Sequence, residues 1–433
     1  MSEFDTASNH FIEWLKANDA TISDSLAIKD YRSEKAGRGV VAIKDIKKDE
    51  VLFSLPRKVL LSEETSQLAT KPGMKDILNS QQGWAPLILC LMYELKSKNS
   101  FWKPYLDILP NAFDTPMFWE QKDIDELAGT GVPDKIGRED AENMFKNTIQ
   151  PIIKSHPDVF DENVHNLNLF HICGSLIMAY SFHDELTPKP SSQANADDKT
   201  EEDEDDEEDE EEQEGIIAMV PMADMLNHRT GFNNARLFHE PESLQMRAIK
   251  DIPASEQIYN TYGDLCNADL LRKYGFVDVP NEFDIVEISG DLVCDVSCPA
   301  DVTDEEKEAK VTFLLEEDVL DDYFVIEKNG DIPPELIASV QVFMMSSQEF
   351  SKAMEKRKVP KPKSTPSVMD KVKLILSKRL EQYKTTLEDD ERMLSNADDL
   401  STKKYNSIIV RAGEKRILLE TEADGPKRKK QRQ

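Results

Sequence analysis

The stretch MVPMADMLNH, residues 219–228, is the starting point for reading the fold of this chain. Its apolar run ends in two adjacent polar side chains. Asn227 and His228 offer hydrogen-bond donors and acceptors at that point, together with exposed backbone groups. The stretch is therefore a candidate ligand site. Short β-like segments lie directly before it and after it, at residues 217–220, 235–238, 244–248 and 257–260.

Two tyrosine–glycine pairs follow this stretch. The first lies in NTYG, residues 260–263, and the second in KYGFV, residues 273–277, twelve residues after Tyr262. Each pair sets a phenol beside a flexible point of the backbone. Either pair alone is explained as well by a core tyrosine at a turn. Their order after the polar end of the apolar run favours a shared site.

A glycine pair stands far upstream, in GRG at residues 37–39, directly before the strand-like run 40–43. Glycines there allow a tight turn and a close approach of backbone to a ligand, although a plain turn also explains them. Another β-like run follows at 51–53, and a later one at 283–296. Helical patterns are expected at residues 10–16, 74–95, 139–182 (two helices), 305–320, 334–350, 368–387 and 403–423. This is an α+β plan with a β-rich first part and a helical second part.

The chain of 433 residues carries 84 acidic and 53 basic side chains, a net charge of −31. Every residue from 201 to 212 is acidic, and we expect 188–214 to be a disordered loop, because it has little apolar area to bury. The overall charge disfavours direct binding to nucleic acid and favours a basic protein as the partner. A solvated spacer and an attractor for a basic substrate both remain open for the loop.

Several other classes of function are excluded at the level of motifs. No GxxxxGK[ST] occurs, GTG at 129–131 lacks the third glycine of a dinucleotide loop, and no metal signature such as HExxH is present. The five cysteines contain no CxxC, which fits a reducing compartment, and Cys294 and Cys298 are expected to be structural. We expect no secretory signal and no membrane partner. The basic run 427–432 indicates nuclear localisation, or else a solubilising tail.

Four motifs, taken in their order along the chain, resemble those of the SET-domain protein-lysine methyltransferases. They are GRGV (37–40), ADMLNH (223–228), NTYG (260–263) and YGF (274–276). The branch that they resemble is typified by the plant Rubisco large-subunit methyltransferase, with a helical insert in the SET domain and a helical substrate-binding domain after it. Finer strings are similar to the group of SET-domain-containing protein 6 and the fungal ribosomal lysine N-methyltransferase 4: QQGWAPL (81–87), GTGVP (129–133), AYSF (179–182) and VRAGEK (410–415).

The resemblance implies a domain plan for the whole chain. An N-terminal helix lies within residues 1–25, the SET domain spans 26–277, and its helical insert covers about 70–185. A helical substrate-binding domain follows over 278–420, and the basic tail is 421–433. The absence of a cysteine-rich segment after Tyr274 fits the branch in which this helical domain, rather than a zinc cluster, closes the site.

The resemblance also implies S-adenosylmethionine as the cofactor and no metal. The backbone around Gly37, Arg38 and Gly39 would hold its methionine end, and Asn227 and His228 would bind its amino-acid portion and adenine. Tyr262 matches the catalytic tyrosine, Tyr274 would line the junction of lysine and cofactor, and Phe276 would lie near adenine. Where the plant enzyme has arginines, this chain has Tyr180, which therefore replaces a cation at the cofactor carboxylate. Ser181 and Phe182 join Tyr274 as expected substrate-binding residues.

The expected function is thus S-adenosylmethionine-dependent monomethylation of a lysine in a basic protein, since Tyr180, Tyr262 and Tyr274 would crowd the amine. The large-subunit ribosomal protein eL42 is the first candidate by resemblance. We expect a monomer in the nucleus and also the cytoplasm. The alternative is a non-catalytic binding module, a SET fold that acts as a chaperone for ribosomal proteins or histones. Intact Asn227, His228 and Tyr262 argue against that alternative, because a pure binder has no use for a cofactor cleft.

Overall fold

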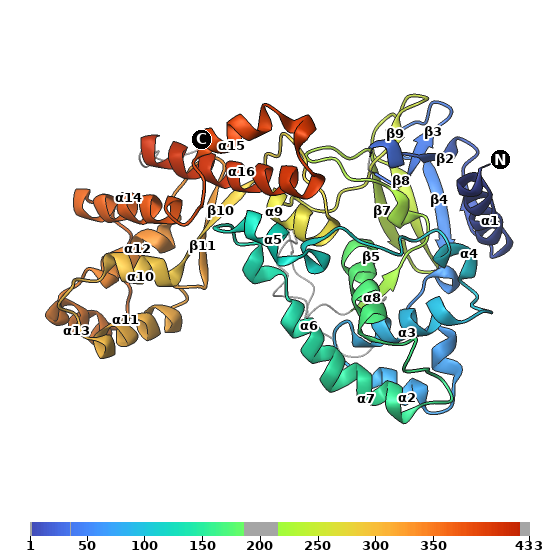
Figure 1. Cartoon of the computed structure of the whole chain (residues 1–433), viewed down its shortest axis with the longest axis horizontal. Coiled ribbons are helices and arrows are strands. Elements are labelled where there is room, and N and C mark those ends of the chain that lie inside the picture. Colours follow the sequence, from blue (N-terminus) through green and yellow to red (C-terminus); the bar gives the residue numbers. More distant parts are fainter. Residues whose placement is uncertain (1, 35, 186–214, 425–433) are drawn as a thin grey trace. The chain divides into compact units, whose positions relative to one another are not determined.

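The computed structural model describes residues 2–34, 36–185 and 215–424, which belong to two compact units (Figure 1). Unit 1 consists of Met1–Phe113 and Gly137–Asp264, and unit 2 of Asp114–Ile136 and Leu265–Gln433. Both units mix helices with short strands, so the α+β class predicted from the sequence is confirmed. The acidic loop predicted over 188–214 and the basic run 427–432 lie outside the described residues.

Unit 1 is built on small antiparallel sheets. One has the order β1-β4-β8-β7 and another the order β2-β3-β9, while β5 pairs with β6. Burial alternates along β8, where Leu244, Met246 and Ala248 face the core and the residues between them do not, as a half-buried strand requires. The bounds are β1 Thr21–Ile22, β2 Leu26–Asp30, β3 Arg38–Ala42, β4 Val51–Pro56, β5 Ser181–Glu185, β6 Gly215–Met219, β7 Ala235–Glu240, β8 Ser243–Ala248 and β9 Gln257–Ile258.

Helices of unit 1 complete its core. The first begins earlier than the predicted 10–16, because the Ser2 hydroxyl accepts from the Asp5 N–H at 3.1 Å and the Asp5 carboxylate accepts from the Ser2 N–H at 3.0 Å. α3 and α8, both strongly apolar, pack against each other. The bounds are α1 Glu3–Ala17, α2 Met74–Asn79, α3 Ala85–Lys96, α4 Lys103–Leu106, α6 Arg138–Met144, α7 Gln150–Ser155 and α8 Leu167–Tyr180.

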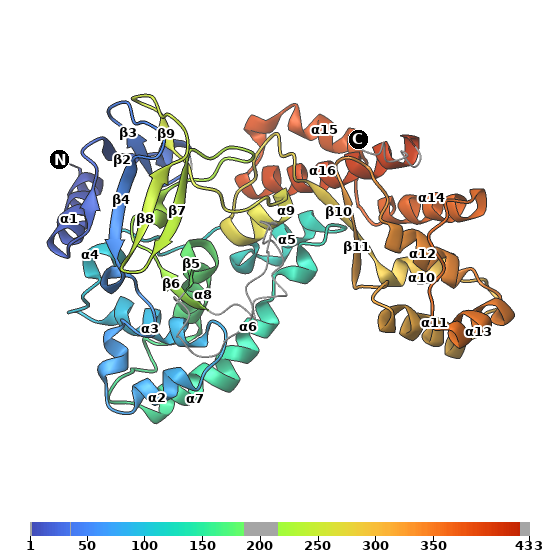
Figure 2. The ribbon, with the colours of Figure 1, turned by 180° about the vertical axis from the view of Figure 1, so that it is seen from behind.

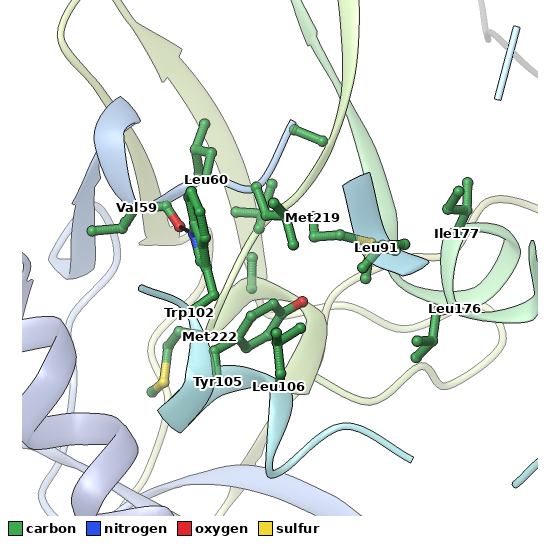
Figure 3. Close-up of a cluster of buried hydrophobic side chains, with 14 of the residues drawn as sticks. Val59, Leu60, Leu91, Trp102, Tyr105, Leu106, Leu176, Ile177, Met219 and Met222 are labelled. Carbon is green, nitrogen blue, oxygen red and sulfur yellow. Dashed lines mark hydrogen bonds between the residues drawn. The ribbon is translucent and has the colours of Figure 1, made fainter. Parts of the chain in front are cut away.

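A cluster of large buried side chains anchors the stretch 219–228 (Figure 3). The indole of Trp102 donates to the carbonyl of Val59 at 2.9 Å, which satisfies its N–H inside the core. Met219, the last residue of β6, and Met222 are buried in the same cluster. The polar end of the stretch therefore starts from a rigid, fully packed point.

Unit 2 is mainly helical, with one antiparallel pair of strands, β10 and β11 (Figure 2). Its own core is formed chiefly by apolar residues of these strands and of α10, α12 and α14. The bounds are α5 Gln121–Ile124, α9 Asn267–Asp269, β10 Ile285–Ser289, α10 Gly290–Ser297, α11 Asp304–Glu316, β11 Tyr323–Glu327, α12 Pro334–Phe343, α13 Ser347–Lys356, α14 Pro366–Leu380, α15 Leu387–Leu394 and α16 Thr402–Asp424.

The prediction of one long β-like segment over 283–296 is wrong in its second half. The strand ends at Ser289, whose hydroxyl accepts from the Leu292 N–H at 3.3 Å and so caps helix α10. Cys294 consequently lies in a helix and Cys298 at its C-cap, and their sulfur atoms are 3.8 Å apart. Both cysteines are buried, which agrees with the structural role expected for them.

A buried ionic cluster fastens the segment Asp114–Ile136 to α16 within unit 2. Arg411 of α16 donates to Asp390 at 2.9 Å and to the backbone carbonyl of Glu126 at 2.7 Å. Lys415, one turn further on, donates to the other oxygen of Asp390 at 2.7 Å. Arg411 also forms an ion pair with the Glu126 carboxylate at 3.0 Å, so Asp390 compensates Lys415 and shares Arg411 with Glu126. Such an arrangement is costly to break, because removal of Asp390 leaves a buried cation without its partner.

Candidate active site

The stretch 219–228 leaves β6 through a short helical turn, Ala223–Met225, and then runs beside residues 257–263. Met222 enters this turn with a positive φ of 79°. Asn227 then forms a parallel bridge with Tyr259, and its carbonyl accepts from the Asn260 N–H at 3.2 Å. Two segments that are separated by about thirty residues of sequence are therefore joined at the polar end of the apolar run.

Tyr262 contacts this polar end through both its backbone and its phenol. Its N–H donates to Nδ1 of His228 at 3.1 Å, and its hydroxyl donates to the carbonyl of Leu226 at 3.0 Å. The two rings are stacked, with centroids 5.1 Å apart and planes at 24°. Because Nδ1 accepts a hydrogen bond, a neutral His228 carries its proton on Nε2.

Gly39 is held where no side chain fits. A Cβ at this position would lie 2.6 Å from Nε2 of Gln257, 2.8 Å from Cδ2 of Tyr31 and 2.9 Å from Nδ2 of Asn227. The amide of Asn227 also donates to the carbonyl of Arg38 at 3.3 Å. The glycine-containing segment at 37–39 is thus brought against Asn227, the proximity that the sequence motifs predict.

The side chain of Arg38 points away from that contact. Its Nη1 donates to the carbonyl of Ile108 at 3.0 Å, its Nε lies 3.3 Å from the Ser8 hydroxyl, and its guanidinium stacks on the Phe4 ring at 4.4 Å. Burial lowers the pKa of this guanidinium from its ordinary value. Arg38 therefore offers its backbone, rather than its charge, to the candidate site, and Gly37 before it turns with a φ of 65°.

Asp224 and Tyr105 are two buried polar residues that the sequence patterns do not identify. The Tyr105 hydroxyl donates to Oδ2 of Asp224 at 2.5 Å, while Oδ1 has no hydrogen-bond partner among the residues that the structure describes. Burial raises the pKa of Asp224 to about 7. Burial, followed by the charge of Asp224, raises the pKa of Tyr180 to about 12, so Tyr180 stays a neutral phenol. A lone acid inside an apolar run was the only signal in the sequence.

Ser181 and Phe182 follow Tyr180 directly, where α8 gives way to β5. Ser181 pairs with Met219 and Phe182 with Ala218, so both belong to the strand pair that leads into the stretch 219–228. Phe182 packs against the core of unit 1. These two residues therefore lie on the strand that pairs with β6, and β6 leads directly into the stretch that contains Asp224, Asn227 and His228.

Tyr274 and Phe276 belong to unit 2, whereas the other predicted site residues belong to unit 1. Their rings lie 6.1 Å apart on either side of Gly275, which has a φ of 82°. A Cβ on Gly275 would lie 3.2 Å from the carbonyl of Asp114, and its own carbonyl accepts from Asn406 at 3.3 Å. Tyr274 and Phe276 are thus held by a tight turn that only glycine accommodates comfortably.

The arrangement in unit 1 suits a nucleoside-like or amino-acid-like cofactor. Nε2 of Gln257 is buried without a hydrogen-bond partner in the described part of the chain, and it borders the space that a Cβ on Gly39 would fill. Asn227 adds an amide beside it. An orphaned donor next to a side-chain-free backbone is what a polar ligand requires. Among the described residues, no group of three or more His, Cys, Asp or Glu is placed to hold a metal ion, and no helix there is long and apolar enough to span a membrane.

Comparison with known families gives two matches. The SET domain matches residues 37–263, and the family described as Rubisco LSMT substrate-binding matches residues 301–418. The chain is 33% identical to the N-lysine methyltransferase setd6 of Danio rerio, over 95% of this chain and 93% of that protein. It is 32% identical to the ribosomal lysine N-methyltransferase 4 of Saccharomyces cerevisiae, over 80% of this chain and 73% of that protein.

Solved structures share the fold. The SET domain of LSMT bound to lysine and AdoHcy matches with a TM-score of 0.71 at 19% identity, over 98% of this chain and 91% of that one. The Rubisco LSMT bound to AdoMet matches equally well, with a TM-score of 0.71 at 19% identity and 96% of this chain covered. At this level of identity the two likenesses establish the architecture.

Proposed function

The chain belongs to the SET-domain N-lysine methyltransferases that carry a substrate-binding domain of the Rubisco LSMT type, and from this premise we propose that it monomethylates a lysine of a basic ribosomal protein. The chain is a protein-lysine N-methyltransferase that uses S-adenosylmethionine, and the large-subunit ribosomal protein eL42 is the first candidate substrate. The yeast relative is named for a ribosomal lysine, and the net charge of −31 favours a basic partner.

One observation carries the assignment of the active site: the phenol of Tyr262 lies against the polar end of the stretch 219–228. The hydroxyl donates to the Leu226 carbonyl at 3.0 Å, which fixes the direction of the phenol oxygen, and a phenol oxygen can accept a hydrogen bond as well as donate one. A phenol oxygen that accepts a hydrogen bond from the N–H of the substrate amine directs the nitrogen lone pair away from the phenol. The phenol does this without adding a competing base. We assign Tyr262 the catalytic role on this ground.

The lysine must lose a proton before it can react. Its ordinary pKa is about 10.4, so at pH 7 only roughly one molecule in a few thousand is neutral. Desolvation of the amine beside the aromatic rings of Tyr180 and Tyr262 favours its neutral form. Tyr180 is held as a neutral phenol by burial, and so adds no charge that would oppose this. Alignment of the amine then supplies most of the rate acceleration.

S-adenosylmethionine supplies the reactive methyl group on its sulfonium. In the proposed arrangement the backbone of Gly37, Arg38 and Gly39 holds the methionine end, with Asn227 and His228 on the amino-acid portion and adenine. Gln257 joins this set, because its buried Nε2 borders the same space and has no partner in the described residues. Phe276 is proposed to lie near adenine, and Tyr180 near the cofactor carboxylate.

Single methylation follows from crowding in this proposal. Tyr180, Tyr262 and Tyr274 would leave little room for a nitrogen that already carries a methyl group, with Ser181 and Phe182 along the substrate side. The enzyme is further proposed to act as a monomer without nucleic acid, in the nucleus and also the cytoplasm. A fluorescent fusion truncated after Gly425 should lose its nuclear accumulation, and one that remains nuclear contradicts the role given to the basic run.

Tyr262→Phe tests the active-site assignment. This change removes one hydroxyl and retains the ring that stacks on His228, so the fold should persist. We expect transfer of tritium from labelled S-adenosylmethionine to ribosomal protein extract to fall at least a hundredfold. Tyr93→Phe is the matched control, because this tyrosine lies on α3 in contact with Phe160, and it should retain full activity. Undiminished labelling by Tyr262→Phe removes Tyr262 from the mechanism.

A further inference from the structure

Unit 2 contains a pocket of about 550 Å³ that none of the predicted site residues lines. Its walls come from the segment 121–134, from residues 287–291 where β10 passes into α10, from Tyr323 of β11, and from the end of α14. Its volume falls within the range of sites that bind small ligands or a few side chains. The pocket includes GTG at 129–131, a motif that the active site does not use.

The two glycines of that motif are required for the shape of the pocket. A Cβ on Gly129, which has a φ of 90°, would lie 2.8 Å from the carbonyl of Gln382. A Cβ on Gly131 would lie 2.5 Å from Oε2 of Glu287. The backbone between them therefore forms a wall directly against β10 and the end of α14, with no side chain of its own at either position. Such close approach is a typical use of glycine.

Two positive charges at the pocket are paired with acids of unit 2, whereas Lys384, whose Nζ lies 3.5 Å from the carbonyl of Asp125, does not line the pocket. Arg379 lies in a buried wall, and its guanidinium donates to the Gly129 carbonyl at 2.5 Å, to the Glu287 carbonyl at 2.8 Å and to the Glu414 carboxylate at 3.1 Å. Lys135 forms an ion pair with Glu287 at 2.5 Å. Arg379 and Glu414 thus cancel each other, and so do Lys135 and Glu287.

Negative charge remains after this cancellation. Asp125, Asp134 and Asp291 line the pocket and are exposed, which leaves a formal charge of −3 on its wall. An aromatic ring lies on the same wall, because Tyr323 also lines the pocket. The ring already attracts a cation of the chain itself, since Nζ of Lys135 lies 5.3 Å from its centroid. Carboxylates beside an aromatic face suit a guanidinium or an ammonium group.

We propose that this pocket binds arginine or lysine side chains of the protein substrate, at a point in its sequence other than the methylated lysine. The inference rests on the proposed function, because it takes the partner to be a basic protein. It adds a second contact for that partner, located in unit 2 and made by Asp125, Asp134, Asp291 and Tyr323. Such a contact sets which basic proteins are bound, and leaves the transfer of the methyl group itself unchanged.

The paired change Asp134→Asn with Asp291→Asn tests the pocket, because it removes two charges without changing volume. With eL42 as the substrate we expect KM to rise three- to tenfold and kcat to stay within twofold. The rise in KM should shrink as salt is added, as for exposed charge pairs. The matched control is Asp301→Asn with Asp370→Asn, two exposed acids of unit 2 that do not line the pocket. Equal KM values for the two double variants overturn the proposal.

A second measurement separates failure of the pocket from failure of the proposed function. A fluorescein-labelled hexa-arginine peptide, which contains no lysine, is titrated against the full chain and followed by fluorescence anisotropy. We expect the Kd to rise at least threefold in the Asp134/Asp291 variant and to be unchanged in the control. If this holds while no ribosomal protein is methylated, the pocket stands and the substrate assignment fails. If methylation occurs but the two Kd values agree, the pocket inference fails alone.

Discussion

At the scale of single residues, the candidate site depends on side chains whose ordinary properties are changed by burial. Three neighbouring side chains occupy the place that a side chain on Gly39 would take, and burial raises the pKa of Asp224 to about 7. Gly39 was singled out through the resemblance of its motif to the SET-domain methyltransferases, because the motif alone is explained as well by a plain turn. The partner of Asp224 could not be predicted, because Tyr105 lies 119 residues away in the chain.

Gly39→Ala should weaken cofactor binding. The new methyl group would displace the amides of Gln257 and Asn227, which lie 2.6 and 2.9 Å from the position it takes. Overpacking of this kind costs about 1–3 kcal/mol, so we expect the Kd for S-adenosylmethionine by calorimetry to rise about tenfold or more. Gly174→Ala on α8 is the control, because nothing lies within 4 Å of its Cβ. An unchanged Kd for Gly39→Ala contradicts the proposed cofactor site.

Asp224→Asn should remove a pH dependence from the stability of the fold. The pKa of Asp224 is raised from 3.8 to about 7, so between about pH 4 and pH 7 the native state binds a proton that the unfolded chain releases. The free energy of unfolding therefore falls as pH rises through this window, by up to about 1.4 kcal/mol per pH unit. Asparagine retains an acceptor for the Tyr105 hydroxyl and carries no titrating group.

Urea titrations of both proteins at pH 5 and pH 7 test this expectation. The variant should gain stability relative to the wild type as the pH rises. Glu414, whose pKa burial also raises to about 7, is present in both proteins and cancels in the comparison. A difference between the two proteins that stays constant with pH indicates that Asp224 does not hold its proton in the native state.

At the scale of elements, apolar runs located several strands of unit 1, whereas β1 was not predicted and the start of β5 was predicted as helix. The runs 51–53, 235–238 and 244–248 fall in β4, β7 and β8, because each has a buried face that leaves its pattern in the sequence. The prediction of a single strand over 283–296 was wrong in its second half. The apolar residues continue from strand β10 into helix α10, and the capping residue Ser289 lies where the strand ends and the helix begins. β11, with Tyr323 and Phe324, was missed within helical, highly charged surroundings.

Asp390 connects the helical elements of unit 2, and Asp390→Asn should destabilise them. The carboxylate lies between Arg411 and Lys415 of α16, and all three side chains are buried. Loss of one partner from a buried ionic cluster costs about 3–5 kcal/mol. We expect a loss of that size in urea unfolding, together with faster hydrogen exchange in α15 and α16. Glu388→Gln, an exposed change on the same helix, should alter neither, and equal effects of the two changes refute the role given to the cluster.

At the scale of the whole molecule, the sequence resemblance predicted a SET domain followed by a helical domain, and both families match the chain. The sequence did not predict that Asp114–Ile136, which lies inside the expected helical insert of the SET domain, would belong to unit 2. The cause lies in contacts such as those of Gly129 with Gln382 and of Arg411 with Glu126, which join residues more than 250 positions apart. Local patterns carry no trace of contacts at that separation.

The residues that pack against the segment Asp114–Ile136 are synthesised much later than the segment itself, and this has a consequence for folding during translation. Leu127 and Val132 leave the ribosome long before Leu271 and Val410, the residues with which they form a small core. At about 5–20 residues per second, roughly 15 to 55 s of translation separate the two ends of this core. During that interval the apolar side chains of Leu127 and Val132 lack part of the core that covers them in the folded protein. Chaperones should bind this segment during synthesis, and a chain that ends at Asp264 should expose the same apolar side chains.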